Sequence, residues 1–226
     1  MDEWSSGGIP PHGWKTEKKG TAGVNPRGSM LYHEKKALSR GAKAVAGADE
    51  AGVGSWAGPV VAGCVCLRNL SFVNEVNDSK KLTPAKREKA FSEILKNAYV
   101  GIGIVDVETI DEINIFEATR LAMEKAIKSL KVGPEIVLVD GRVKPEGKFK
   151  RKNIIDGDCK SLSIAAASII AKVSRDRIMR ELDKVYPGYG FAQHKGYGTK
   201  QHLRALRKLG PSPVHRKSFK PVSNLS

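Results

Sequence analysis

The sequence predicts one α/β domain, a mixed β-sheet flanked by helices and followed by a basic, helical C-terminal portion. Short apolar runs of strand length alternate with longer segments of helical periodicity, an order typical of a sheet with helices on its faces. Hydrophobic residues make up 40% of the 226 residues, enough for a single domain with a core. Beyond Asp183 the chain contains Lys and Arg but no acid, which sets its last part apart from the rest.

The domain is expected to begin near Met30. Residues 1–29 are rich in Gly, Pro, Ser and Lys and lack periodicity, and the segment VNPRGSM resembles a protease site with a cloning scar. We interpret residues 1–29 as an expression leader, appended or disordered, and exclude them from the fold. Residues 30–185 are expected to form the core, and residues 186–226 a basic helical portion of the same domain.

A strand, an acidic turn and a second strand are expected to open the core. An apolar run from Ala44 to Ala48 ends at Asp49 and Glu50, glycines follow, and a second apolar run spans Val60 to Leu67. Successive strand residues point to opposite faces, so two adjacent carboxylates can serve one site only where the strand bends or ends. The glycines permit such a bend. A turn with two solvated acids remains the alternative for this segment taken alone.

Alternating helices and strands are expected after the two opening strands. Thr83 can cap a helix that has Pro84 in its first turn. Further elements are expected as a strand at Tyr99 to Val105, a helix at Glu108 to Leu130, and a buried strand at Ile136 to Val139 that runs into Asp140.

The second half of the chain is expected to be mainly helical. A basic segment, Arg142 to Lys152, resembles a loop with a turn around Glu146 and Gly147, and it leads to the sequence Asp156-Gly157-Asp158. The longest helix is predicted from Ser161 to Val185, with Pro187 ending it, and a last short helix from Thr199 to Leu209.

The charge of the chain indicates an anionic partner. Net charge is +15, from 39 Lys and Arg against 24 Asp and Glu, which favours nucleic acid first and a membrane surface second. The one-signed C-terminal part fits a phosphate-facing surface and contains Lys184, Lys195, Lys200, Arg204, Arg207, Lys208, Arg216, Lys217 and Lys220.

Localisation follows from what the sequence lacks. It shows no apolar run of 18 residues and no signal peptide, so no membrane span is expected. Cys64, Cys66 and Cys159 form neither a disulfide framework nor a zinc pattern. Buried thiols in a reducing compartment, the cytoplasm, are the better interpretation.

Four acids share one kind of setting at expected strand ends. Asp49 and Glu50 close one strand, Asp140 closes another, and Asp158 precedes a helix. Four converging carboxylates would repel one another unless cations neutralised them, and the hard ions Mg²⁺ and Mn²⁺ suit carboxylate oxygens. Two such ions roughly 3.5–4 Å apart can activate a water and stabilise the leaving oxygen in phosphodiester cleavage.

Seven motifs in one order give the chain a family resemblance. They are AGADEAGVGSWAGPVVAG, NDSKKLTPAKRE, NIFEATRLAM, VLVDG, GDCKSLSIAAASIIAKVSRDR, HKGYGTKQHL and PVHRKSF. From about Val45 to Val222 the chain resembles bacterial ribonuclease HII. The resemblance implies an RNase H-like catalytic core, with the C-terminal portion binding substrate. It also implies metal-dependent cleavage of RNA in RNA–DNA hybrids and beside single ribonucleotides in duplex DNA, leaving a 5′-phosphate and a 3′-hydroxyl.

The resemblance assigns the metal-binding acids by position. Asp49, Glu50, Asp140 and Asp158 resemble the family's catalytic, metal-binding acids, with Asp49 as the ligand shared by both ions. Asp156 is the weaker candidate for the fourth place, because Asp158 directly precedes the matching Cys-Lys-Ser sequence.

The resemblance also assigns residues that contact substrate. Tyr197 matches the tyrosine that stacks on the sugar beside the RNA–DNA junction, and Lys80 and Lys172 resemble basic residues near the substrate backbone. Gly52-Val53-Gly54 stands where the family has Gly-Arg-Gly. The glycines still allow backbone amides to approach the ribose 2′-hydroxyl, but the guanidinium is lost, so preference for a single ribonucleotide is expected to change.

Two other functions remain open from the residues alone. A nucleic-acid-binding module without catalysis would use the basic tail, and a related RNase H-like DNA nuclease, such as a junction resolvase, would use the same core. The five histidines are scattered in the sequence, so we expect structural or backbone-contact roles for them. A monomer is expected.

Overall fold

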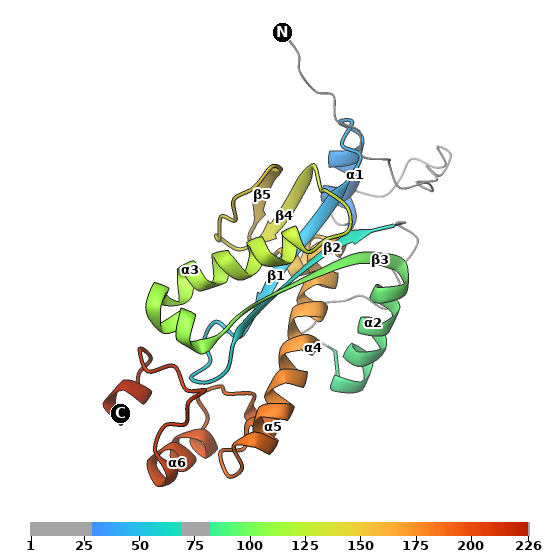
Figure 1. Ribbon diagram of the computed structural model, residues 1–226. Coiled ribbons are helices and arrows are strands. Elements are labelled where there is room, and N and C mark those ends of the chain that lie inside the picture. The colour runs from blue at the N-terminus through green and yellow to red at the C-terminus, as the bar shows by residue number, and fades with distance from the viewer. Residues whose placement is uncertain (1–28, 69–81, 226) are drawn as a thin grey trace.

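The computed structural model describes residues 29–68 and 82–225 (Figure 1). The expected leader lies outside the described residues except for Ser29, and so does Lys80. Within the described ranges no helix is long and apolar enough to cross a membrane.

Five strands form one mixed sheet in the order β3-β2-β1-β4-β5. They are β1 (Val45–Ala51), β2 (Val60–Leu67), β3 (Ala98–Val105), β4 (Ile136–Asp140) and β5 (Lys150–Ile154). The first three pair antiparallel, whereas β4 runs parallel to β1 and β5 runs parallel to β4. This arrangement confirms the predicted mixed sheet and places the C-terminal end of β4 beside that of β1.

Helices cover both faces of the sheet (Figure 1). Helix α3 (Val107–Lys128) packs on one face, against Ala46, Ala48 and Ala62 among others. Helices α4 (Leu162–Val185) and α2 (Pro84–Asn97) pack on the other face, around Val65 and Leu67. The remaining described helices are α1 (Tyr32–Leu38), α5 (Phe191–His194), α6 (Lys200–Leu209) and two 3₁₀ turns, Gly157–Cys159 and Val222–Asn224.

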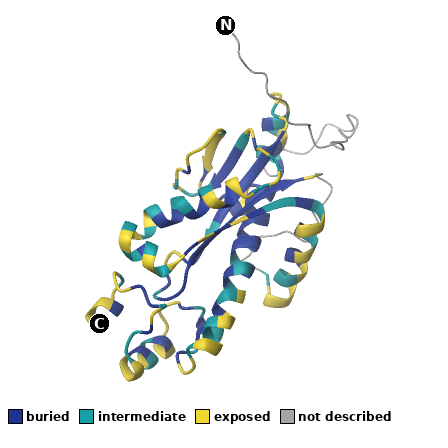
Figure 2. Ribbon diagram, viewed as in Figure 1, coloured by how far each residue is buried: buried dark blue, intermediate teal, exposed yellow. Residues whose placement is uncertain are grey.

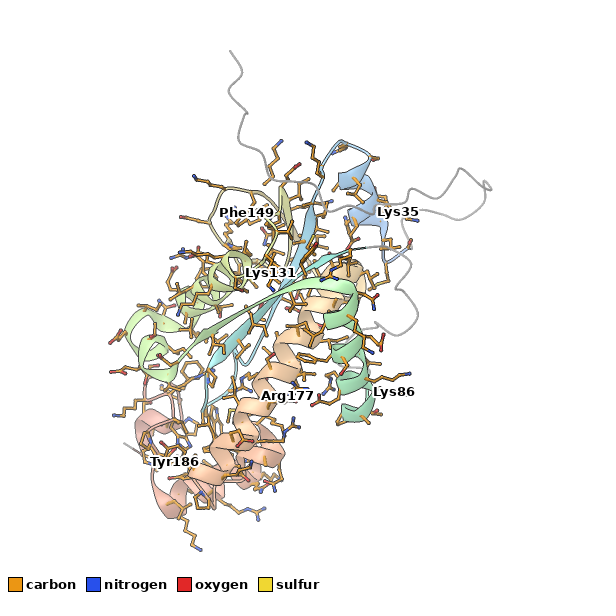
Figure 3. All side chains as sticks on the ribbon, turned by 45° about the vertical axis from the view of Figure 1, so that its right-hand side comes forward. Lys35, Lys86, Lys131, Phe149, Arg177 and Tyr186 are labelled. Atoms are coloured by element: carbon orange, nitrogen blue, oxygen red, sulfur yellow. The ribbon has the colours of Figure 1, made fainter. Side chains whose placement is uncertain are left out.

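Small residues let α4 lie very close to the sheet. A Cβ added at Gly47 would come within 2.2 Å of the Ser163 carbonyl carbon, and one at Gly63 within 2.5 Å of the Ala167 oxygen. The alanine-rich start of α4 meets these glycines, so both partners are small where they touch. Further along, α4 faces α2, and Arg177, labelled in Figure 3, pairs with Glu88 there at 2.6 Å.

The predicted helix starts are confirmed by their caps. Thr83 accepts a hydrogen bond from Lys86 N, Ser161 from Ile164 N, and Thr199 from His202 N. Helix α3 departs from the expected uninterrupted helix, because Asn114 has φ 69° and its side chain caps the residues that follow.

The structure also corrects other parts of the sequence interpretation. The segment expected to be a basic loop contains strand β5, whose first four residues are exposed at the sheet edge and therefore lack apolar alternation. The short helix α1 is not among the expected elements; it carries Glu34, which is buried and accepts hydrogen bonds from Ser161 and Ser163. Cys64 and Cys66 are buried as expected, but Cys159 is exposed.

The C-terminal portion packs on the loop between β1 and β2. Ala57 of that loop forms a buried cluster with Met179, Tyr189 and Phe191. In Figure 2 strands β1 and β2 are mostly buried, whereas β5 and much of α6 are exposed. The basic side chains Lys200, Arg204, Arg207 and Lys208 of α6 are all exposed, which keeps them available for an anionic partner.

Candidate active site

The two acids of the opening strand lie where β1 loses one of its neighbours. Pairing of β1 with β4 ends at Ala48 and Val139, while pairing with β2 continues through Asp49, Glu50 and Ala51. The strand thus runs past the acids, whereas the sequence predicts that it ends at them. Asp49 is buried and its Oδ1 accepts a hydrogen bond from Glu50 N at 2.7 Å.

Asp140 and Asp158 reach the same place from β4 and the following 3₁₀ turn. Asp140 is the last residue of β4, and its Oδ1 accepts a hydrogen bond from Gly157 N at 2.6 Å. This bond holds the 3₁₀ turn against the end of β4, and Asp158, within that turn, is buried. Asp156 lies differently: its side chain is 74% exposed and its carboxylate is 3.7 Å from Lys160 Nζ.

The pKa of Asp49 is affected by the other three acids, which shows that the four acids lie close together. Burial raises the pKa of the Asp49 carboxyl well above its usual range, and the neighbouring charges of Glu50, Asp140 and Asp158 raise it further. All three other acids are thus close enough to repel a charge on Asp49. A cation would relieve that repulsion, and an all-oxygen set of donors suits a hard divalent ion.

The four carboxylates fit a divalent ion by chemistry, although their side chains are not arranged around one. As they stand, no three His, Cys, Asp or Glu side chains in the described ranges form a ready ion-binding group. The Oδ1 atoms of Asp49 and Asp140 are both engaged with backbone N–H groups. Binding an ion between them therefore requires the side chains to adjust.

A hollow of about 300 Å³ lies beside these acids. Asp49, Glu50 and Asp140 line it together with the Gly52-Val53-Gly54 loop, and so do Lys172 and Tyr197. Arg87 and Ser168 line it too. The sequence motifs contain both of these residues, but nothing in their local pattern distinguishes them from ordinary helix residues.

Gly52 and Gly54 differ in their backbone conformation and in the space that a side chain would have. Gly52 has φ +97°, and a Cβ there would lie 2.0 Å from Arg175 Nε. A Cβ at Gly54 would meet nothing within 4 Å, and its backbone is not in the left-handed region. Packing thus requires glycine at 52 but not at 54, where the chain faces open space beside the hollow.

Tyr197 lies next to this loop. It forms an isolated β-bridge with Ser55, and the residue is 37% exposed. Two cations lie over the ring, Lys172 Nζ at 5.6 Å and the Arg175 guanidinium carbon at 5.3 Å from its centre. Lys172 also pairs with Asp176 at 2.7 Å, which holds its side chain in place.

Histidines cluster in the structure although they are scattered in the sequence. His194 and His202 stack with ring centres 4.3 Å apart, and His202 Nε2 lies 3.0 Å from His215 Nε2. Their other contacts are with backbone groups, with Ser212 and with the rings of Trp56, Tyr189 and Phe191, so the expected structural role agrees with their position. The cluster itself was not predictable, because His202 and His215 belong to different motifs.

Comparison with known proteins then decides the family. The family model for Ribonuclease HII matches residues 46–222. The Ribonuclease HII of Acetivibrio thermocellus is 54% identical over 191 residues, 84% of this chain and 75% of that protein. The Ribonuclease HII of Chlamydia pneumoniae is 50% identical over 199 residues, 87% of this chain and 92% of that protein.

The chain belongs to the ribonuclease HII family. It is accordingly a metal-dependent endonuclease of the ribonuclease H type, which hydrolyses RNA in RNA–DNA hybrids. Family membership decides against the non-catalytic binding module and the junction resolvase.

Solved structures of ribonuclease HII relatives share the fold. The ribonuclease H2 of Pyrococcus horikoshii matches with a TM-score of 0.70 and 28% identity, covering 80% of this chain and 96% of that one. The RNase HII of Archaeoglobus fulgidus, solved in complex with PCNA, matches with a TM-score of 0.65 and 30% identity, over 78% and 95%. Both likenesses confirm the RNase H-like mixed sheet flanked by helices.

Proposed function

We propose that Asp49, Glu50, Asp140 and Asp158 are the catalytic acids and hold two divalent ions, Mg²⁺ or Mn²⁺. The convergence of three other carboxylates on buried Asp49, beside an open hollow, carries this proposal. When bound, such ions supply the positive charge that activates a water and stabilises the leaving oxygen. Asp49 would be the shared ligand, since the charges of the other three acids all act on its carboxyl.

In this proposal the residues that line the hollow bind and recognise the ribonucleotide. Tyr197 stacks on the sugar beside the scissile phosphate, and the amides of Gly52, Val53 and Gly54 approach the ribose 2′-hydroxyl. Lys172, which also lines the hollow, faces the substrate backbone. Lys80 keeps its predicted backbone-contact role, although it lies outside the described residues.

The substrates proposed are RNA–DNA hybrid and duplex DNA that contains single ribonucleotides. Cleavage on the 5′ side of a ribonucleotide leaves a 5′-phosphate and a 3′-hydroxyl. The exposed basic side chains of α6 hold the duplex through its phosphates. The enzyme acts as a monomer in the cytoplasm.

A cleavage assay with matched acid variants tests the proposal. Two duplexes are compared, one with a single embedded ribonucleotide and one full hybrid, each with Mg²⁺, Mn²⁺ or EDTA. Asp49→Asn and Asp158→Asn are expected to abolish cleavage of both. Asp156→Asn is the control, because its side chain is exposed and lies near Lys160, and it should cleave normally. Cleavage that survives EDTA, or an inactive Asp156→Asn beside an active Asp158→Asn, would refute the assignment.

A further inference from the structure

Two adjacent buried residues, His215 and Arg216, connect the Gly52-Val53-Gly54 loop to Tyr197. Arg216 is 0% exposed and His215 is 1% exposed. The backbone of the pair is held against the loop, because His215 bridges Ala57 and Arg216 N donates to Trp56 O at 2.8 Å. Asp111 of α3 fixes the next two residues by accepting from Lys217 N and Ser218 N.

The Arg216 guanidinium donates hydrogen bonds to several carbonyl groups of the loop between β1 and β2. Its Nη2 donates to Gly52 O at 2.7 Å and to Gly58 O at 2.9 Å, its Nη1 donates to Val53 O at 2.8 Å, and its Nε donates to Gly58 O at 3.0 Å. A lysine ammonium could not reproduce this set, because only the planar guanidinium fork presents several donors in fixed directions.

These bonds determine where the loop amides point. A trans peptide directs its N–H opposite to its C=O. With the carbonyls of Gly52 and Val53 turned toward Arg216, the N–H groups of Val53 and Gly54 point away from it. Neither amide donates a backbone hydrogen bond within the described residues, and both residues are exposed. Two preset donors thus face outward beside the hollow.

A chain of neutral histidines reaches Tyr197 from the other member of the pair. The Tyr197 carbonyl can only accept, so His202 Nδ1, 3.0 Å away, carries the proton. His202 Nε2 then accepts from His215 Nε2–H at 3.0 Å, and His215 Nδ1 accepts from Ser212 N at 2.9 Å. Every donor meets an acceptor in this tautomer assignment, so the Tyr197 backbone is tied to His215.

Burying the Arg216 charge destabilises the fold, which indicates that its geometry serves function. No carboxylate forms an ion pair with Arg216 among the described residues, and a buried charge without a directly paired counter-charge destabilises a fold. Burial, together with the neighbouring Arg175 charge, lowers the pKa of Arg216 to about 9. Such costs are typical of positions where a fixed geometry serves function.

We propose that His215 and Arg216 are positioning residues which set the loop amides and Tyr197 in one fixed geometry for reading a ribonucleotide. Arg216 orients the Val53 and Gly54 amides, while His215, through His202, holds Tyr197. This proposal rests on the proposed function, in which that loop and Tyr197 contact the ribose.

The test compares Arg216→Lys with wild type on the two duplexes of the cleavage assay. We expect single-turnover cleavage at a lone ribonucleotide to fall about 10- to 100-fold more than cleavage of a full hybrid. Only one 2′-hydroxyl can be read in the first duplex, whereas the hybrid offers one at every step. Binding of either duplex in EDTA should stay within about 3-fold, since α6 and not Arg216 faces the phosphates. Arg40→Lys, at an exposed turn that follows α1 and outside the proposed site, is the matched control and should behave as wild type.

Hydrogen exchange of the free protein supplies a readout independent of cleavage. Amides of residues 52–58 should exchange faster in Arg216→Lys, while those of α4 keep wild-type protection. His202→Phe keeps a ring but loses both hydrogen bonds; it should speed exchange at residues 195–199 and lower cleavage at the lone ribonucleotide in the same selective way. If Arg216→Lys does not fold, His202→Phe still tests the proposal.

The outcomes separate the inference from the function on which it rests. Equal losses on both duplexes, or unchanged exchange at residues 52–58, would overturn the positioning role while leaving the nuclease intact. A wild-type enzyme that cannot cleave at a lone ribonucleotide would overturn both the proposed ribose reading and this role.

Discussion

Replacing each glycine of the loop by alanine should separate packing from substrate approach. At Gly52 the added Cβ lies 2.0 Å from Arg175 Nε and 2.6 Å from Arg175 Cδ, on a residue with φ +97°. At Gly54 the added Cβ meets nothing within 4 Å. The two substitutions add the same methyl group two residues apart, so each is the control for the other.

The expected cost of Gly52→Ala follows from two contributions. A left-handed backbone costs a non-glycine residue about 1–2 kcal/mol. Arg175 must also move, and its guanidinium donates to Pro59 O, Lys195 O and Ala57 O at 2.8–3.0 Å. Losing one such charged hydrogen bond costs about 1.5–3 kcal/mol. The sum, about 2.5–5 kcal/mol, corresponds to a Tm lower by roughly 5–20 °C for a chain of this size.

Gly54→Ala should lower activity and leave stability unchanged, in contrast to Gly52→Ala. Its Tm should stay within about 2 °C of wild type, while cleavage at a lone ribonucleotide falls about 10- to 100-fold, because a methyl group would hold the ribose away from the loop amides. Thermal unfolding and single-turnover cleavage of both variants measure this. A wild-type Tm for Gly52→Ala would contradict the close packing against Arg175, and full activity for Gly54→Ala would contradict close substrate approach.

Four further predictions concern charge. The raised pKa of Asp49 means that the ionised carboxylate destabilises the metal-free fold at high pH, whereas below the unfolded pKa near 3.8 the carboxyl is protonated in both states and has no such effect. Asp49→Asn should therefore raise the Tm of the metal-free protein at pH 8 but not at pH 3.5. Val53→Arg should raise the ratio of lone-ribonucleotide to hybrid cleavage about 10- to 100-fold, and an unchanged ratio would mean that this side chain does not read the junction. Burial lowers the pKa of His202 to about 4, so wild-type stability should fall as pH drops from 6.5 to 4, and chemical unfolding of His202→Phe should show less of that fall. Removing the charges of Arg204 and Arg207 with Gln should reduce the salt slope of duplex binding by about 0.9 for each phosphate that the protein no longer neutralises; an unchanged slope would exclude α6 from the duplex interface.

The sequence by itself determined the local elements and the chemical character of the site. Apolar runs of the right length predicted four of the five strands, and Thr83, Ser161 and Thr199 marked helix starts that the structure confirms. These features depend on residues close together in the chain, whose periodicity and capping chemistry are visible without a fold. The acids were recognisable for the same reason, as carboxylates directly after apolar runs.

Only the tertiary structure decided which of these residues meet. Strand β5 has an exposed, charged sequence and exists because it pairs with β4, so no local pattern could predict it. Parallel pairing of β4 with β1 brings Asp140 to Asp49, and a bond spanning 164 residues ties Arg216 to Gly52. A buried guanidinium without a carboxylate becomes understandable only once the carbonyl groups that surround it are known, because hydrogen bonds between distant segments leave no periodic signal in the sequence.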